Sequence, residues 1–435
     1  MKRLLKNKNA LIFVFSRVLS RFGDSLESLA LMYLVYDLTG SALAMGTVML
    51  FSMIPNLLIS PVAGVIADRY NKKRIMFLAE MTRAGAIILI PVLMFNGMIQ
   101  LWHIYTMAVF VSIAESFFEP CSNIVFVSIV GKEELHLMSS FATVLGRIAG
   151  ILGYSLAGVL IVFLNKEILF IFDSITFLLS AIAVLIITLP QSEERKIGKV
   201  LEFVDDFKDG IKYIFSTRLI PVLFLGILIL SALLVPLERF VPVAVDEIFR
   251  LSPAWAGMFM TTLTVGSIIG GIIYPILVKK NIKLKNAYLY NLALLGGVIL
   301  ISCYMKSQYI SFVMFFSVGA ISSIIGTWSF TEIQKCCDEK YLGRVGSVAT
   351  MVMLAAAPLA SFLSGVLIEV FSLINVWKLA GLLFIIIGLF MYMKINKLHE
   401  INSEVVKISG VLGDDLAKEA GSQIASLSKG SVDAV

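Results

Sequence analysis

Ionisable residues recur inside stretches of the sequence that are otherwise apolar. In the stretch near residues 10–36, Arg17, Arg21 and Asp24 follow helical spacing, and Glu27 stands beside them. A charge in the middle of a lipid bilayer is costly unless it meets a partner or water, so an ionisable residue inside a membrane span is a candidate for function. The pattern indicates one polar face on a helix that is otherwise suited to lipid.

A second stretch, near residues 101–130, carries Glu115, Glu119 and Asn123 four residues apart, which places them on one helix face. Two carboxylates one turn apart in a low-dielectric site cannot both ionise cheaply, so one of them is expected to hold a proton near neutral pH. A proton-coupling site needs such a group. We therefore predict that Glu115 and Glu119 form the coupling site, with Asp24 as a further candidate.

Arg147, in the stretch near residues 136–164, supports a second interpretation of the same carboxylates. This arginine, or Arg21, could neutralise Glu115 or Glu119 permanently and hold the helices together without any titration. Both interpretations stay open at the level of sequence, and Arg147 is counted among the proton-coupling candidates.

Further candidates lie in the second half of the chain. Glu238 and Arg239 stand between Pro236 and Pro242, and the prolines should distort the helix near an outer gate or a substrate exit. Trp328 could stack on an aromatic or cationic substrate, although tryptophans in spans mostly pack or lie at the membrane interface. The predicted substrate-cavity residues are Arg21, Glu27, Asn123, Glu238, Arg239 and Trp328.

The composition indicates which elements must position these residues. Of the 435 residues, 58% are hydrophobic and 15% are charged, whereas a soluble domain is about half apolar and about a quarter charged. At about 20 apolar residues per crossing, the chain has room for about twelve spans and little else. We predict an all-α integral membrane fold of two six-helix halves, with spans near 10–36, 41–67, 75–96, 101–130, 136–164, 167–189, 219–245, 253–278, 286–305, 308–333, 341–371 and 375–396.

Lysine and arginine are concentrated in alternate loops, which predicts orientation. The basic loops are assigned to the inside, so both termini are predicted to be cytoplasmic in a multi-pass protein of the cell membrane. The formal net charge of +6 does not indicate a nucleic-acid partner, because that would require basic residues gathered on one soluble face.

The one strongly polar internal segment divides the chain into two halves. Within it, apolar residues from Val200 to Ile214 recur at helical spacing, which predicts an amphipathic helix on the inner membrane surface. The predicted organisation is a first half over 1–189, a cytoplasmic linker over 190–218, a second half over 219–397 and a cytoplasmic tail over 398–435. Glycines weaken helix formation in the tail, so we expect disorder or a frayed surface helix there.

A loop between the second and third spans carries a recognisable motif. The chain reads Gly64-Val65-Ile66-Ala67-Asp68-Arg69-Tyr70-Asn71-Lys72-Lys73-Arg74, which resembles the signature G-x-x-x-D-R-x-G-R-R of the major facilitator superfamily. Asn71 stands where the family has glycine, and asparagine is the residue best able to replace glycine at a left-handed turn. The resemblance implies a gating loop formed by Gly64, Asp68, Arg69, Lys72 and Lys73.

The acid of this gating loop has a specific expected role. In the family it faces the start of the eleventh span, here Tyr341-Leu342-Gly343-Arg344-Val345, where a carboxylate can meet the positive end of a helix. Arg69 with Lys72 could bind carboxylates or lipid phosphates. The alternative is that the basic cluster is only a signal of topology.

Span five carries Gly146, Gly150, Gly153 and Gly158, which resemble the glycine-rich antiporter motif of the family. Tyr154 stands where that motif has proline, so the motif is incomplete. The glycines also suit close helix packing.

Resemblance across most of the chain extends to the branch that contains macrolide-efflux proteins, the enterobactin exporter and a lysophospholipid transporter. It implies a secondary active transporter, a monomer that exports amphipathic small molecules in exchange for protons and contacts membrane lipid. The alternatives are a lipid transporter and, from a different class, a membrane sensor or channel. No enzyme, cofactor or metal is predicted, because the sequence has no phosphate-binding G-x-x-x-x-G-K-[ST] loop and its three histidines lack a metal-ligand pattern.

Overall fold

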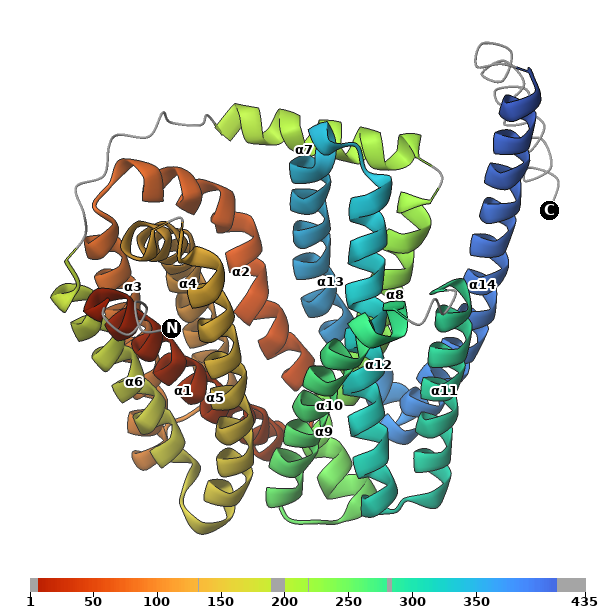
Figure 1. Cartoon of the computed structure of the whole chain (residues 1–435). Coiled ribbons are helices and arrows are strands. Elements are labelled where there is room, and N and C mark those ends of the chain that lie inside the picture. The colour runs from red at the N-terminus through yellow and green to blue at the C-terminus, as the bar shows by residue number, and fades with distance from the viewer. Residues whose placement is uncertain (1–6, 132, 189–199, 218, 280–283, 413–435) are drawn as a thin grey trace.

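The computed structural model describes residues 7–131, 133–188, 200–217, 219–279 and 284–412. These residues form helices joined by short connections (Figure 1). The first half of the chain contains α1 (Lys8–Thr39), α2 (Ala42–Arg69), α3 (Lys72–Phe95), α4 (Leu101–Val130), α5 (Leu135–Phe163) and α6 (Lys166–Ile186). The second contains α8 (Ile220–Glu238), α10 (Ala254–Lys279), α11 (Leu284–Met305), α12 (Gln308–Cys336), α13 (Leu342–Phe371) and α14 (Leu373–Leu412).

Ten of the helices in the described ranges are long and apolar enough to cross a membrane. The two other long helices of the bundle, α1 and α11, are not among these ten. Helix α1 carries the polar face of Arg17, Arg21, Asp24 and Glu27, and the apolar part of α11 is the shorter segment Tyr290–Met305. The architecture therefore agrees with the predicted all-α membrane fold.

Both halves have their chain ends at the side of the bundle that carries α7 (Val200–Ser216). At the start of α1, the Asn7 amide donates to the Ile129 carbonyl at the end of α4 (2.9 Å), and the Asn9 amide donates to the Thr188 carbonyl beyond α6 (3.1 Å). The far end of α14 lies on the same side (Figure 1). We call this the α7 side.

The halves meet at the end opposite α7 and separate towards the α7 side (Figure 1). Helix α2 packs against α13 and α5 packs against α10. Glycines make these contacts close, since a Cβ at Gly46 would clash with the Ser361 carbonyl and one at Gly257 with the Tyr154 carbonyl. Ser155 also hydrogen-bonds to Thr261 across the interface (2.6 Å).

The linker helix α7 agrees with the predicted amphipathic helix, and it docks on the second half. The ring of Tyr213 stacks on Tyr341 (4.2 Å between centroids), and its hydroxyl accepts from the Asp338 backbone N–H (3.0 Å). Asp209 forms an ion pair with Arg344 of α13 (3.1 Å). The linker is therefore held by both stacking and charge.

Two predicted boundaries need correction. The span predicted over 219–245 is not one helix: α8 ends at Glu238 and is followed by α9 (Val241–Val243) and the π-helix η2 (Ala244–Phe249), as expected beside two prolines. The disorder or fraying expected from residue 398 is wrong as far as Leu412, because these residues continue α14 without a break. The rest of the predicted tail lies outside the described residues.

Candidate functional site

A cavity of about 340 Å³ opens among α1–α5 near the middle of the bundle. Its apolar lining includes Met49, Met53, Ile87 and Met107. Its charged lining consists of Arg21, Asp24, Glu27, Arg83, Glu115 and Arg239, the last of which comes from the second half of the chain. The cavity therefore offers three carboxylates, three guanidinium groups and apolar surface to one ligand.

A second cavity of about 630 Å³ lies against it, between α1, α4 and α5. Arg21, Ser25 and Tyr154 line both cavities, so the two lie side by side, and we call them together the recess. Asn123 and Arg147 belong to the second cavity. Arg21 and Arg147 are exposed, and neither forms an ion pair with any described residue. The second cavity is therefore the more basic part of the recess.

The two carboxylates of α4 lie in different surroundings. Glu119 accepts from the guanidinium of Arg17 (2.6 Å), which also lies over the Phe118 ring (4.8 Å). Its ion-pair partner is thus Arg17, and neither Arg147 nor Arg21, the partners that the sequence suggested. Glu115 lines the first cavity and has no ion pair among the described residues. The arrangement separates a paired carboxylate from one that faces the recess.

Behind the first cavity, Arg83 of α3 joins two carboxylates. Its Nη2 donates to Asp24 Oδ1 (3.1 Å), and its Nη1 lies 3.8 Å from Glu80 Oε2. The guanidinium lies over the Phe177 ring at 4.0 Å. Glu80, which is 0% exposed, also accepts from the Ser180 hydroxyl (2.8 Å). One arginine thus links the cavity surface to the interior of the first half.

Asp173 of α6 completes this interior group, and it is 1% exposed. The Thr176 hydroxyl donates to its carboxylate over a long 3.3 Å, while making a shorter bond to the Asp173 backbone carbonyl (2.8 Å). No ion pair of Asp173 occurs in the described part of the chain. Its carboxylate lies so close to α1 that a Cβ at Gly23 would clash with it.

Comparison with known proteins decides what kind of bundle surrounds this recess. The model of the Major Facilitator Superfamily matches residues 13–361. The chain belongs to the major facilitator superfamily. This confirms the family and the fold that were predicted from the sequence.

Among curated proteins of this superfamily, the chain is similar to macrolide efflux protein A of Streptococcus pyogenes, with 23% identity over 391 residues that cover 89% of this chain and 95% of the relative. It is also similar to the multidrug efflux pump Tap of Mycobacterium bovis, with 22% identity over 384 residues, 84% of this chain and 89% of the relative. These relatives are transporters named for efflux.

Two solved structures share the fold at low sequence identity. The nucleoside transporter NupG superposes with a TM-score of 0.71 at 13% identity, over 89% of this chain and 99% of that chain. A bacterial homologue of the iron transporter ferroportin, in an inward-facing state, superposes with a TM-score of 0.69 at 16% identity, over 88% and 98%.

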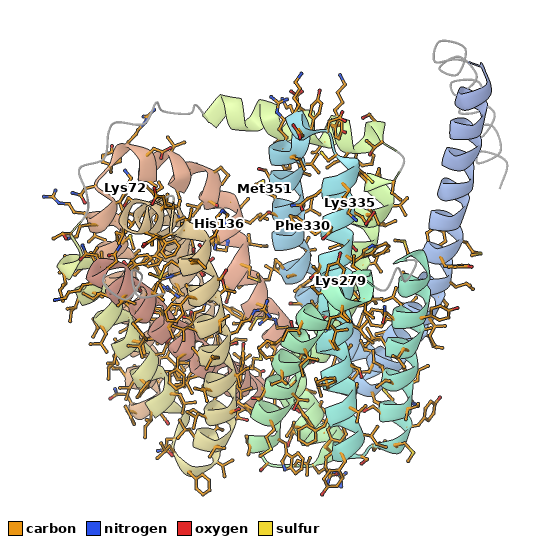
Figure 2. The ribbon with its side chains drawn as sticks, viewed as in Figure 1. Lys72, His136, Lys279, Phe330, Lys335 and Met351 are labelled. Carbon is orange, nitrogen blue, oxygen red and sulfur yellow. The ribbon has the colours of Figure 1, made fainter. Side chains whose placement is uncertain are left out.

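The superfamily loop between α2 and α3 lies on the α7 side, and its predicted gating residues line neither cavity. Figure 2 labels Lys72 in this loop and Lys335 at the end of α12, both towards the α7 side. Asp68 and Arg69 are exposed. Arg344, at the start of α13, forms an ion pair with Asp209 of the linker (3.1 Å). The contact between Asp68 and the start of α13 stays a prediction.

Two members of the loop have contacts within their own half. Lys73 donates to the carbonyls of Leu185 (2.9 Å) and Ile187 (2.6 Å) at the end of α6, where a cation complements the helix end. Asn71 is not in the left-handed conformation suggested by its replacement of glycine: its φ is −65°, and its side chain caps α3 by accepting from the Arg74 N–H (3.2 Å). Lys73 thus holds α3 and α6 together.

The other predicted residues have varied positions. Glu238 and Arg239 are half-buried at the end of α8, and Arg239 alone of the pair lines the first cavity. Trp328 is buried in α12 and lines neither cavity described above, as expected of a packing residue. Within the described ranges, no three His, Cys, Asp or Glu side chains are grouped as metal ligands would be.

Proposed function

We propose that the protein is a proton-coupled exporter of amphipathic small molecules, such as macrolide-like drugs or siderophores, and that it works by alternating access. The observation that carries this proposal is the recess in the middle of the bundle, where Asp24, Glu27 and Glu115 face a common space lined by methionine and isoleucine. Apolar walls with a few convergent charges suit a ligand that is itself amphipathic. The efflux names of the relatives support the same direction of transport.

The proposed orientation has the α7 side in the cytoplasm and the chain in the cell membrane as a monomer, with no nucleic-acid partner. The recess is then open to the cytoplasm, and the close contacts at Gly46 and Gly257 form the outer closure. Rocking one half against the other would open these contacts and close the α7 side. Substrate enters from the cytoplasm or the inner leaflet and leaves on the outside.

Coupling requires that a proton and the substrate compete for the same carboxylate. In the open recess, Glu115 releases its proton to cytoplasmic water and its carboxylate can then bind substrate. After the halves rock, an external proton binds the carboxylate and the substrate leaves. The Arg17–Glu119 pair keeps α1 and α4 together through this cycle. Protons and substrate therefore move in opposite directions.

The test compares Glu115→Gln, Glu119→Gln and Asp24→Asn in proteoliposomes with labelled erythromycin, a macrolide. Glu115→Gln should still exchange erythromycin across the membrane but lose accumulation driven by a pH gradient. Glu119→Gln should instead lower expression and thermal stability, because it leaves Arg17 without its partner. If all three variants keep full gradient-driven transport, the coupling site is elsewhere or the coupling ion is not a proton.

The second candidate function is lysophospholipid transport, and it has its own observation. Arg21 and Arg147 are exposed in the second cavity without an acidic partner, where they could bind an anionic headgroup. Arg147→Gln should then reduce uptake of a fluorescent lysophospholipid much more than that of erythromycin. A sensor or channel has no exchange step, so counterflow by the unmodified protein would argue against both, and against an enzymatic role.

A further inference from the structure

We propose that Asp173 holds a buried proton behind the cavity, and that Arg83 links this interior to the substrate site by exchanging partners between Asp24 and Glu80. The inference rests on the proposed proton-coupled function and extends it to residues that the sequence analysis did not single out. It assigns the coupling proton to the interior of the first half as well as to the cavity wall.

Charge balance is the first argument. The ionisable groups that face this interior are Asp24, Glu27 and Arg17 of α1, Glu80 and Arg83 of α3, Glu115 of α4 and Asp173 of α6. Arg17 is bound to Glu119. Arg21 and Arg239 line the cavity but form no ion pair with any described residue, which leaves Arg83 as the cation that contacts these carboxylates. Several carboxylates cannot all be ionised around one guanidinium in a membrane interior. At least one of the enclosed carboxylates must therefore hold a proton.

Burial indicates which carboxylates these are. Glu80 and Asp173 are 0% and 1% exposed, whereas Asp24, Glu27 and Glu115 line the cavity. Asp173 has no cation within ion-pair distance among the described residues and only one long hydrogen bond from Thr176. A carboxyl group so placed is far cheaper to bury neutral than charged. Asp173 is accordingly the group that holds the proton in this conformation.

The geometry of Arg83 provides the switch. Its Nη2 is at hydrogen-bond distance from Asp24, while its Nη1 is 3.8 Å from Glu80 Oε2. Among the described residues, neither that oxygen nor Arg83 Nε has a hydrogen-bond partner, although both are buried. A shift of about 1 Å across the face of Phe177 would bring Nη1 to hydrogen-bond distance from Glu80. The two unsatisfied atoms thus favour a second position of the guanidinium.

The proposed step moves one proton between Asp173 and water, and it changes the charge of the interior by one unit. When Asp173 is protonated, the Arg83 guanidinium donates a hydrogen bond to Asp24, as in this structure. When Asp173 releases its proton to water in the open recess, the negative charge of the interior rises and draws Arg83 towards Glu80, which frees the Asp24 carboxylate for a substrate. Because Gly23 lets α1 lie directly against Asp173, the change also reaches the helix that carries Asp24.

The first experiment needs no substrate. Infrared difference spectra of the purified protein, titrated through neutral pH, should show the C=O band of a protonated carboxyl group. Glu115→Gln should remove only the signal of the cavity-wall carboxyl group, and adding Asp173→Asn to it should remove the remaining band. The matched control is Ser174→Ala in the same background, which removes a hydroxyl bonded to the Ala84 carbonyl and no charge, and it should keep the band. A band that is the same in Glu115→Gln with and without Asp173→Asn would overturn the proposal, whether or not the protein transports erythromycin.

The second experiment tests the switch through Arg83→Lys, which keeps the charge but lacks the planar fork that reaches two carboxylates. Accumulation of erythromycin driven by a pH gradient should fall by about tenfold, a usual size for coupling between two sites. Counterflow exchange should fall much less than driven accumulation, and the infrared band should be retained. Equal losses of counterflow and of driven accumulation, or no loss of either, would contradict a role for Arg83 in coupling.

Discussion

The two halves of the bundle have the same kind of helix packing but opposite interiors. Where α3 and α6 pack in the first half, the buried residues include Glu80, Arg83 and Asp173. Where α11 and α14 pack in the second half, they include Leu295, Ile299, Trp377 and Phe384. The polar contacts around these two helices include the Trp377 indole donating to the Pro236 carbonyl of α8 (3.0 Å) and Lys378 over the Tyr304 ring (5.0 Å). The carboxylates that we propose for coupling therefore lie in the first half.

The largest effect that would sharpen this comparison is expected at Trp377. Trp377→Ala should destabilise the protein by about 3 to 5 kcal/mol, because it empties a large buried site and removes one hydrogen bond. The loss should be the same in acid and in alkaline buffer, since the side chain packs among apolar groups. Thermal melts in detergent at several pH values measure it. A loss that varies with pH would place titrating groups in the second half and break the comparison.

An intermediate effect is expected where the repeated loops differ. Gly64 is followed eight residues later by Lys72, and Gly271 is followed at the same offset by Lys279. Four residues after the glycine, the first copy has Asp68 near the end of α2, whereas the second has Pro275 within α10. Asp68→Asn should slow transport by about the tenfold that corresponds to 1.4 kcal/mol, near the upper range for a carboxylate at a helix N-terminus. Substrate affinity should change little, because Asp68 lines neither cavity of the recess. The measurements are initial rates of erythromycin transport and equilibrium binding.

The matched control for this loop is Lys279→Gln, at the end of α10 in the second half. It removes a charge from the loop that lacks the acid, and it should leave transport nearly unchanged. An equal loss of binding and transport in Asp68→Asn would indicate a folding defect. A slow Lys279→Gln variant would show that both loops gate, contrary to the asymmetry between the halves.

The smallest effect concerns the helix that joins the halves. Arg344→Gln removes the ion pair with Asp209, whose side chains are 32% and 56% exposed. A pair this exposed contributes about 0.2 to 1 kcal/mol, less in high salt. Asp209→Asn should have an equal or smaller effect, because Arg344 also lies over the Tyr341 ring (5.8 Å). Melting curves at low and high salt test this, and a larger loss would mean that α7 contributes to the stability of the second half.

Much of the fold could be predicted because hydropathy, loop charge and the superfamily motif all act along the chain. The end of α14 could not, for a physical reason. The glycines near Gly410 predict a weak helix. Helix α14 is already formed before it reaches them, and it extends without a new nucleation step. A distortion near Glu238 was predicted, because Pro236 and Pro242 disturb a helix locally.

The site was only partly predictable. Glu115, Asp24 and Arg21 were found as a polar pattern on single helices, and they do line one recess. Which charge pairs with which depends on contacts between helices, and the Arg17–Glu119 pair joins residues far apart in the sequence. Asp173 is isolated in the apolar part of α6, since the other acid of the helix, Glu167, lies in its first turn, and it shows no repeating pattern. The same rule that selected Asp24 could have selected it, together with Glu80 and Arg83, if every charge inside a span had been considered.

Helix α14 has a consequence for measurement. It is a 40-residue helix, and at a rise of about 1.5 Å per residue it is about 60 Å long, against a hydrocarbon core of about 30 Å. Its end at Leu412 must therefore stand well clear of the bilayer, even if the helix tilts. A fluorophore attached there has a calculable separation from lipid dyes in the membrane. Energy transfer between this fluorophore and the lipid dyes would therefore report tilting of the second half during transport.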